Sequence, residues 1–533
     1  MRVSLENLKA LEKIGVQIPK YDVKKMQEIT KKNPTWLHVG GGNIFRGFIC
    51  ALADDLLDEK LINKGIIAVE TFDKEVIEKI YKPFDNLVMV VTLANKKEPK
   101  LRLVGSIADG LTANPDHLKD KKILKEYFRN PSLQLVSFTI TEKGYKLHDL
   151  DGNLLENIKD DLEKGPETCR SAMAIITSML YQRYLTNKLP LALVSMDNCS
   201  HNGTRLKKAI LTIAKYWIEK GIMENDFISY LEDESKISFP WTMIDKITPR
   251  PANSVANLLR NKGIDNMQAV MTARHTFIAP YVNTEEASYL VIEDKFPNGR
   301  PPLEKAGVFM TDRETVNKVE RMKVTACLNP LHTALAVLGC LLNKKTIANE
   351  MKDPLLVKVV KGIAKEGLQV VEDPKIISPK AFAKEVIYER LPNPAIPDTP
   401  QRIATDTSLK IPERYGQDLK AYLESPTLDL DALNYIPLAI ASWFRYLLGI
   451  DDEGNKMECS PDPNLFDLQN KLKNIKLGDP ASYNGELKEI LSNHKIFVID
   501  LSKTGLCNKI ENYFIKMISH PHAVEELLAE IKQ

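Results

Sequence analysis

Lys323, Asn329 and His332 are polar residues inside the apolar segment MKVTACLNPLHTALAVLG, which begins at residue 322 of this 533-residue chain. An amine, an amide and an imidazole can exchange protons or donate hydrogen bonds, and they are costly to bury unless they are paired or used. For His332 alone, a hydrogen-bonded histidine of the core is the more ordinary interpretation. The three together mark a candidate site.

The spacing of these residues conflicts with a regular helix. His332 is nine positions after Lys323, and at about 100° per residue the two side chains would face opposite sides of a regular helix. Pro330 cannot donate its backbone bond to residue 326 and should bend the helix. We therefore expect a kink or a π-type bulge in this segment, a feature common at functional helices.

A second group of polar residues follows the apolar run LPLALV in VSMDNCSHNG. In open α/β sheets, ligands bind beyond the carboxyl ends of strands. By spacing alone a polar turn is favoured over a binding site. The members of the group are Asp197, Asn198, His201 and Asn202.

Asp245 lies between apolar residues in PWTMIDKITPRP, with Lys246 and Arg250 close by. A buried acid with basic neighbours is more often a structural ion pair than a catalyst. Asp245 is therefore a candidate site residue, with a structural ion pair as the alternative.

A glycine run in WLHVGGGNIFRGF separates an apolar strand from a helical pattern. A strand, Gly-x-Gly and a helix are typical of a dinucleotide pyrophosphate site, because glycine lets the backbone approach the phosphates. Gly40 and Gly42 take the first two places, but the third falls on Phe45, so the fingerprint is incomplete. Arg46 could add a cation to the phosphate site or form an internal salt bridge. A tight turn without a ligand is the alternative.

An acidic residue at the end of the next strand favours NAD over NADP. Glu70 is 30 residues after Gly40, and the stretch VETFD contains no arginine for a 2′-phosphate. Glu70 could instead cap the following helix. The predicted cofactor contacts are Gly40, Gly41, Gly42, Asn43, Ile44, Arg46 and Glu70.

Apolar strands and helical patterns alternate in the first part of the chain, which predicts a Rossmann-type parallel sheet covered on both faces. From about residue 313 helices dominate. We therefore expect an NAD-binding domain over 1–300 and a mainly α-helical substrate domain over 301–533, with the Pro- and Gly-rich segment 296–307 as the crossing. The expected strands are 36–39, 65–73, 86–95, 133–145 and 189–198, and the expected helices 44–57, a start at 105–106, 117–129, 170–185, 205–221, 313–328, 331–346, 354–366, 431–448, 464–475 and 519–532.

Composition excludes several classes of function. The net charge of +2 with interspersed signs argues against nucleic acid and anionic membranes as partners. We expect no bilayer-spanning segment and no signal peptide. Seven scattered cysteines predict reduced thiols in a cytoplasmic protein, and the nine histidines show no metal-ligand spacing, since HPH at 520–522 is typical of a surface turn.

Seven segments, in this order, resemble the mannitol dehydrogenase family, the polyol-specific long-chain dehydrogenases. They are HVGGGNIFRGF, FTITEKGY, MDNCSHNG, MIDKITPRP, YLVIEDKF, CLNPLH and NPAIPDTPQRIATDTSLKIP, and they run from residue 36 to about 412. The resemblance implies metal-independent, NAD(P)-dependent interconversion of a secondary alcohol and a ketone, in a cleft between a Rossmann-type domain and a helical domain.

The resemblance also assigns roles to individual residues. Lys323 matches the family's general acid/base, and Asn198 and Asn329 match its carbonyl-binding amides, with His332 orienting substrate hydroxyls or the lysine. A lysine needs a lowered pKa for this task. The remaining matches are Asp245, Arg402 and Lys410 as substrate contacts and Glu142 near a proton path.

Three departures from the family pattern stand out. The interval from Lys323 to Asn329 is six positions instead of five, and Pro330 follows where the family has Gly. We interpret the extra residue as the bulge predicted above. Thr407 also stands where Gly is expected. The opening GGGNIFRGF is closer to the mannitol-1-phosphate dehydrogenases, whereas the rest of the chain is not.

The substrate expected from length and C-terminal extension is a keto-sugar acid, with reduction of D-fructuronate to D-mannonate by NADH. Arg402 could hold the carboxylate with both prongs. Tagaturonate/altronate and the neutral fructose/mannitol pair are the alternatives, in a monomer or small homo-oligomer. A nucleotide-binding regulatory protein without turnover is the competitor from another class.

Overall fold

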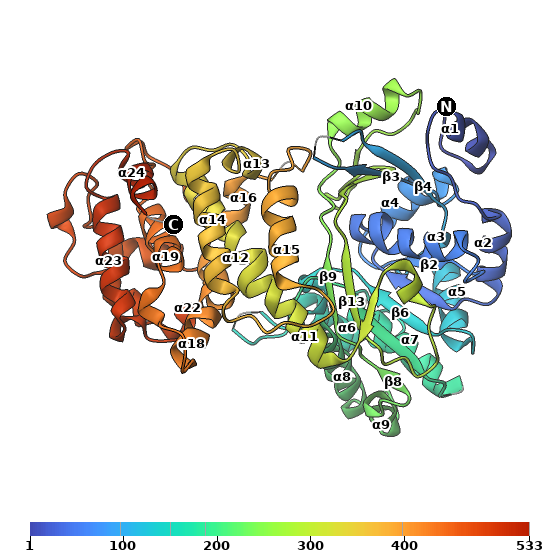
Figure 1. Ribbon diagram of the computed structural model, residues 1–533. Coiled ribbons are helices and arrows are strands. Elements are labelled where there is room, and N and C mark those ends of the chain that lie inside the picture. The colour runs from blue at the N-terminus through green and yellow to red at the C-terminus, as the bar shows by residue number, and fades with distance from the viewer. Residues whose placement is uncertain (96, 150, 187, 397, 532–533) are drawn as a thin grey trace. The chain divides into compact units, whose positions relative to one another are not determined.

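The computed structural model describes residues 1–95, 97–149, 151–186, 188–396 and 398–531. Contacts between residues divide the chain into two compact units, Met1–Asn317 and Lys318–Gln533 (Figure 1). The segment 296–307, where the sequence suggested a crossing, lies inside the first unit. The division falls instead within the helix α11 (Arg313–Arg321).

The first unit is built on a six-stranded sheet whose strands are all parallel, in the order β5-β2-β1-β6-β7-β8. The predicted parallel sheet is therefore confirmed. Each of its strands is largely buried, which explains why they read as continuous apolar runs and not as alternating patterns. The strands are β1 (Trp36–Val39), β2 (Ile66–Glu70), β5 (Ile107–Thr112), β6 (Leu135–Phe138), β7 (Leu191–Ser195) and β8 (Ile237–Ser238).

Two expectations for this unit are wrong. No helix begins at 105–106, because β5 follows directly and pairs with β2. The expected strand at 86–95 forms as β3 (Val88–Leu93), but it lies outside the six-stranded sheet. The connection to β4 (Lys100–Val104) is too short for a parallel crossover, so these two strands pair antiparallel, and β12 (Tyr281–Glu285) completes this smaller sheet.

The helix after the glycine run lies between two sheets. It begins with the π-helical segment η2 (Phe45–Ile49) and continues as α3 (Cys50–Asp58). Its apolar side chains share one core with Trp36, Ala68 and Val282. The helices α5 (Leu118–Arg129), α7 (Ala172–Thr186) and α8 (Asn202–Glu219) pack successively on one another away from this core (Figure 1).

A third sheet closes the first unit, with the order β14-β13-β9. Its strands are β9 (Thr242–Asp245), β13 (Tyr289–Glu293) and β14 (Phe309–Thr311), and β10 (Val270–Met271) pairs with β11 (Phe277–Ile278). The other elements of this unit are η1 (Leu5–Asn7), α1 (Leu8–Lys13), α2 (Val23–Lys32), α4 (Lys74–Val76), η3 (Ile77–Tyr81), η4 (Lys82–Phe84), η5 (Glu142–Tyr145), α6 (Glu156–Lys164), α9 (Asp226–Glu232), α10 (Asn253–Asn261) and η6 (Leu303–Ala306).

The second unit is helical in the part of it that is described, as predicted. Its core contains α12 (Asn329–Leu341) and α19 (Tyr435–Leu447), which pack on each other and on α14 (Pro354–Gly367). Around them lie η7 (Met322–Cys327), α13 (Ile347–Glu350), α15 (Pro379–Glu385), η8 (Val386–Arg390), α16 (Pro400–Ala404), α17 (Thr407–Ile411), η9 (Pro412–Gly416), α18 (Gln417–Glu424), η10 (Leu430–Ala432), α20 (Leu465–Leu472), η11 (Pro480–Ser482), α21 (Leu487–Leu491), α22 (His494–Phe497), η12 (Leu501–Lys503), α23 (Gly505–Met517) and α24 (Ala523–Glu530).

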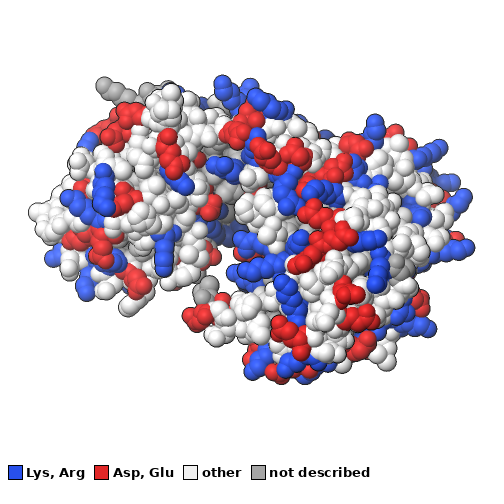
Figure 2. Space-filling model, turned by 90° about the horizontal axis from the view of Figure 1, so that it is seen from below, with Lys and Arg blue, Asp and Glu red and all other residues white. Residues whose placement is uncertain are grey.

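The expectation that no segment is long and apolar enough to cross a bilayer needs correction. The helical run Arg313–Leu341 is 29 residues long, and its most apolar window has a mean hydropathy of 1.5. Within the protein 78% of that window is buried. A core helix of a soluble protein passes the same test by composition, because both environments select apolar side chains. On the face shown in Figure 2, Lys/Arg and Asp/Glu side chains are interspersed.

Candidate functional site

Gly40 and Gly42, in the turn after β1, are needed for two different physical reasons. Gly40 has a φ of +104°, and a Cβ there would lie 2.3 Å from the carbonyl oxygen of Thr139. Gly42 is exposed, and a Cβ on it would meet nothing within 4 Å. Gly40 is thus required by the fold itself. Gly42 leaves open backbone at the carboxyl edge of the sheet, ahead of a helix, and this cradle fits a dinucleotide pyrophosphate.

Glu70, the last residue of β2, supports the glycine turn from the side. Its buried carboxylate accepts the N–H of Gly41 at 2.9 Å and those of Phe72 and Asp73 at 2.8 and 3.2 Å. Burial raises the pKa of Glu70, and the three N–H groups oppose that shift. Its contact with a ribose stays a prediction.

Arg46 points inward and is completely buried. Its Nη1 donates to the carbonyl oxygen of Ala279 at 2.7 Å and its Nη2 to Oδ1 of Asn43 at 2.7 Å. Burial lowers the pKa of this guanidinium. Both partners are neutral, and among the described residues no carboxylate pairs with it. Arg46 therefore ties the glycine turn to the loop before β12, and its contact with phosphate stays a prediction.

Gly47 lets the helix after the glycine turn approach strand β12 closely, the kind of packing that the third glycine of the fingerprint usually allows. A Cβ on Gly47 would lie 2.7 Å from Cγ1 of Val282 in β12. The spacing of the fingerprint puts its third glycine at Phe45, two positions before Gly47. The π-helical segment η2 shifts the register. Phe45 instead stacks on buried His38, with ring centroids 4.0 Å apart.

The polar turn after β7 organises the loop that follows β6. The carboxylate of Asp197 accepts the N–H groups of Ile140 and Thr141 at 2.9 and 2.8 Å and the hydroxyl of Tyr145 at 2.6 Å. Thr141 has φ +64° and ψ 163°, a conformation that is nearly confined to glycine and costs about 1–3 kcal/mol. Asp197 holds this strained backbone in place. Burial raises the pKa of Asp197.

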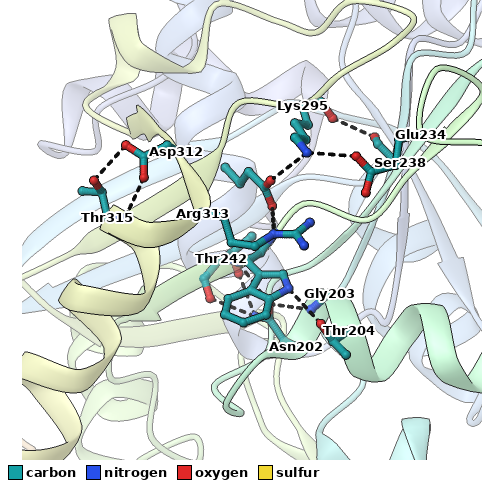
Figure 3. A network of polar contacts seen from close by, with 12 residues as sticks. Asn202, Gly203, Thr204, Glu234, Ser238, Thr242, Lys295, Asp312, Arg313 and Thr315 are labelled. Carbon is teal, nitrogen blue, oxygen red and sulfur yellow. Dashed lines mark hydrogen bonds and ion pairs between the residues drawn. The ribbon is translucent and has the colours of Figure 1, made fainter.

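The other members of this turn have separate roles. Asn202 is buried and exchanges hydrogen bonds with Thr242 of β9, its Nδ2 donating to Oγ1 at 2.9 Å and its Oδ1 accepting the N–H at 3.0 Å (Figure 3). His201 stacks on Trp241 at 4.2 Å. Asn198 stays exposed at the tip of the turn. The polar turn is therefore present in the structure, and a binding role for Asn198 stays a prediction.

Two further candidates of the first unit lie near this turn in sequence or space. Glu142 is exposed and pairs with Nη1 of Arg205 at 3.0 Å. Asp245 is the last residue of β9 and is buried. The six-stranded sheet has β2, β1, β6 and β7 in succession, so Glu70, the glycine turn and Asn198 all lie at the carboxyl edge of these parallel strands.

A network in the first unit anchors the start of the helix that leads to Lys323. Arg313, the first residue of α11, donates through Nε to the buried carboxylate of Glu293 at 2.9 Å and lies over the ring of Trp241 at 5.2 Å (Figure 3). Lys295 bridges Glu293 and Glu234, at 3.7 and 2.9 Å. This network was missed by sequence reasoning, because its members are far apart along the chain.

The predicted bulge between Lys323 and Asn329 is confirmed. Residues Met322–Cys327 form a π-helix, and the N–H of Leu328 donates to the carbonyl oxygen of Lys323, five residues back, at 3.2 Å. Leu328 leaves helical geometry at φ −133°, and α12 restarts at Asn329 with Pro330 in its first turn. Lys323 is buried, with 1% of its surface exposed. The π-turn absorbs the extra residue of the interval.

His332 lies beside an acid that the sequence analysis did not select. Nε2 of His332 is 3.8 Å from Oδ2 of Asp398. Arg402 donates to the same carboxylate through Nε at 2.6 Å and Nη2 at 2.5 Å. Burial lowers the pKa of His332 to about 4, against the opposing effect of Asp398. The imidazole is therefore neutral at pH 7. In the segment PDTPQR, Asp398 and Arg402 are four positions apart, about one helical turn, and this spacing could have revealed the pair.

Lys410 points back at the backbone of its own segment. Its Nζ donates to the carbonyl oxygens of Ile403, at 2.9 Å, and Thr405. Burial lowers its pKa to about 8. Thr407, where glycine was expected, is buried in α17 with its hydroxyl donating to Ala404 at 2.7 Å. The left-handed residue here is Asp406, with φ +56°, which explains why Thr407 is tolerated.

The second unit thus brings Asn329, His332, Arg402 and Lys410 into one region, together with Asp398 and Arg414, which sequence reasoning missed. Mutual effects on their pKa values connect the charged members. Among the residues that the structure describes, no group of three or more His, Cys, Asp or Glu could hold a metal ion. The chemistry available here is proton transfer and hydrogen bonding to oxygen.

Comparison with known proteins covers nearly the whole chain. Residues 34–305 match the family described as "Mannitol dehydrogenase Rossmann domain", and residues 315–518 match "Mannitol dehydrogenase C-terminal domain". The D-mannonate oxidoreductase of Thermotoga maritima is 51% identical over 536 residues, covering 100% of this chain and 99% of that protein. The D-mannonate oxidoreductase of Escherichia coli is 29% identical, over 88% of this chain and 90% of its own length.

Solved structures agree on the fold. A substrate-free D-sorbitol dehydrogenase matches with a TM-score of 0.79 and 24% identity, over 98% of this chain and 99% of that one. The mannitol 2-dehydrogenase of Pseudomonas fluorescens, in a ternary complex with NAD and D-mannitol, matches with a TM-score of 0.73 and 24% identity, over 100% of both chains.

Proposed function

The chain belongs to the mannitol dehydrogenase family, and on that premise we propose that it interconverts D-fructuronate and D-mannonate with NAD as its cofactor. The observation that carries the substrate class is the 51% identity, over the full length, to a D-mannonate oxidoreductase. We assign NAD binding to residues 1–300 and substrate binding to 301–533. We place the enzyme in the cytoplasm as a monomer or small homo-oligomer.

The glycine turn and its supports are the proposed cofactor site. The open backbone at Gly42 admits the pyrophosphate, and Gly41, Asn43 and Ile44 flank it. Arg46 and Glu70 hold the turn from both sides. When bound, the dinucleotide supplies the hydride that reduces the keto carbon.

Lys323 is the proposed proton donor for reduction and the acceptor in reverse. Its place in a π-helical segment supports this role, because such segments recur at functional sites and because the bulge absorbs the longer interval to Asn329. Proton transfer by a positioned side chain contributes about 10²–10⁴-fold to the rate. Burial excludes water that would otherwise compete for the proton.

The amides of Asn198 and Asn329 are the proposed donors to the oxygen that gains negative charge. Preorganised donors of this kind contribute about 2.7–4 kcal/mol each. Neutral His332, held beside Asp398, accepts or donates a hydrogen bond to substrate hydroxyls. Asp245, Arg402 and Lys410 are kept as substrate contacts, and Glu142 as a residue of the proton path.

One panel tests the proposal. Oxidation of NADH is followed with fructuronate, tagaturonate and fructose, and fructuronate is expected to have the highest kcat/KM. A best rate with tagaturonate or with fructose would identify one of the two alternatives instead.

Lys323→Ala separates an enzyme from a nucleotide-binding regulatory protein. The variant should lose turnover by about 10²–10⁴-fold while its affinity for NADH, measured by fluorescence, is retained. Lys305→Ala, at a residue exposed in the first unit, is the matched control and should behave as wild type. Unchanged turnover in Lys323→Ala would remove this residue from the mechanism.

A further inference from the structure

Arg414 lies in the π-helical segment η9 of the second unit and has only neutral hydrogen-bond partners. Its Nη1 donates to Oγ1 of Thr333 and to the carbonyl oxygen of Asn329, the latter at 3.5 Å. Its Nε and Nη2 have no partner among the described residues of this unit. No carboxylate of the described second unit pairs with this partly buried guanidinium.

A partly buried cation without an anion loses part of its hydration and gains no charged partner in return, and two of its donors, Nε and Nη2, stay open to a ligand. Asp398, the acid beside His332, is already committed, because both of its oxygens receive N–H groups from Arg402. Burial lowers the pKa of Arg414 to about 10. The guanidinium is still a cation at neutral pH, so the ligand that it favours is an anion.

The position of Arg414 places that anion next to the proposed chemistry. Thr333 and Asn329 are one helical turn apart on α12, and the hydroxyl of Thr333 donates to the carbonyl oxygen of Asn329 at 3.0 Å. Arg414 therefore contacts the backbone of a proposed oxyanion donor. Its charge also lowers the pKa values of His332 and Lys410.

The charges that face this region leave it positive. Its cations are Arg390, Arg402, Lys410 and Arg414, and Asp398 is paired with Arg402. Asp406 and Asp462 act on Lys410 from the neighbouring segments and raise its pKa. Asp462 is in turn occupied by the N–H of Ser408 at 2.7 Å and by its hydroxyl.

We propose that Arg414 binds the carboxylate of the sugar-acid substrate through Nε and Nη2, and so distinguishes sugar acids from neutral polyols. The proposal rests on the proposed function and names the residue that sets its substrate class. Arg402, which the sequence suggested for this task, already donates Nε and Nη2 to Asp398, so a substrate contact of Arg402 is left with Nη1 only. Two parallel N–H···O bonds from a guanidinium match a carboxylate in geometry as well as charge.

The test compares Arg414→Gln with wild type on fructuronate and fructose. The variant should lose about 100-fold in kcat/KM for fructuronate, mainly through KM, and less than about threefold for fructose, because only the acid presents a carboxylate to the missing guanidinium. Glu413→Gln, an exposed neighbour in the same segment, is the control and should leave both rates unchanged.

The outcomes separate this inference from the proposed function. Wild type that prefers fructose contradicts the function. Wild type that prefers fructuronate, together with an Arg414→Gln variant that loses equally on both substrates or on neither, overturns the role of Arg414 alone. If Arg414→Gln does not fold, Arg414→Lys replaces it. Lysine keeps the charge but cannot form two parallel bonds, so kcat/KM should fall about 10-fold for fructuronate and stay unchanged for fructose. An equal loss of kcat/KM on fructose would overturn the role of Arg414.

Discussion

Arg402 holds Asp398 with both prongs of its guanidinium, Nε to Oδ1 at 2.6 Å and Nη2 to Oδ2 at 2.5 Å. The acid is buried, whereas 69% of the arginine side chain is exposed. The pair therefore fixes the carboxylate from the solvent side and leaves it 3.8 Å from the imidazole of His332. A bidentate pair gives the carboxylate one orientation, and through it the histidine.

Asp398→Asn should lower kcat by about 10-fold, because the carboxylate that orients His332 and holds Arg402 is lost. The affinity for NADH should not change, since the glycine turn lies in the other unit. Steady-state kinetics and NADH fluorescence check both. Asp373→Asn, at an exposed acid, is the control. Equal kcat in Asp398→Asn and wild type would contradict an orienting role.

The pKa of Lys410, about 8, predicts a pH dependence. Lys410 is charged below that pH and loses its charge as the pH rises through it, so attraction for an anionic substrate weakens in the same window. We expect kcat/KM for fructuronate to fall above pH 8, in addition to any effect of the proton donor. Lys410→Arg should move the fall to higher pH. An identical profile for both proteins would exclude Lys410 as its source.

Glu350 should destabilise the protein as the pH rises. It is buried in α13, neither carboxyl oxygen has a partner among the described residues, and burial raises its pKa from 4.5 to about 9. The folded state then binds a proton that the unfolded state releases, so stability falls between about pH 4.5 and 9. Glu350→Gln should raise Tm at pH 8 by several degrees and change little at pH 4.5.

Glu366 is the matched contrast for that measurement. It is a partly buried acid, and its carboxylate accepts N–H groups of Asn434, Tyr435 and Ile436 at 2.7–3.1 Å, at the start of α19. Glu366→Gln should therefore lower Tm at pH 8, because it removes a charge from a helix N-terminus. Thermal melts of both variants at pH 4.5 and pH 8 test these expectations. A fall in Tm at pH 8 for Glu350→Gln would contradict the proposed effect of the buried Glu350 carboxyl group.

Substitution of Gly40 and of Gly42 should affect different properties, folding stability and NADH binding respectively. Gly40→Ala places a Cβ 2.3 Å from a carbonyl oxygen at a φ of +104°, and should cost at least about 2–3 kcal/mol of folding stability. Gly42→Ala meets no atom and should fold normally, but should weaken NADH binding about 10-fold by crowding the pyrophosphate. Melts and NADH titrations separate the two effects. If Gly42→Ala bound NADH with normal affinity, the pyrophosphate would not bind at Gly42.

Deletion of Val324 tests the bulge directly. The residue is only partly buried, and its removal should convert the π-turn of Met322–Cys327 to an α-turn with Lys323 and Asn329 still on their present faces. We expect the deletion to keep turnover within about 10-fold of wild type. Insertion of an alanine after Val324 rotates the faces by about 100° and should abolish turnover. Equal loss in both variants would contradict the interpretation.

Much of the fold follows from local patterns. Long apolar runs between helical stretches indicated a parallel sheet, because strands buried on both faces need apolar residues throughout. The bulge at Lys323 was also foreseeable, since a proline and an extra residue interrupt a strong helical pattern. β3 and β5 were misplaced, because a short apolar run does not reveal its partner strand.

For the site, residue types and motif order in the chain were sufficient to select Lys323, Asn329, His332 and the glycine turn as candidates, because such groups are rare in apolar surroundings. The partners of those groups were not visible. Asp398, Arg414 and the carboxylate of Glu70 acquire their roles from neighbours that only folding brings within 3 to 4 Å. Whether a cation such as Arg46 or Arg402 is available to a ligand depends on what it already holds, and hydrogen bonding between distant segments is a property of the folded chain.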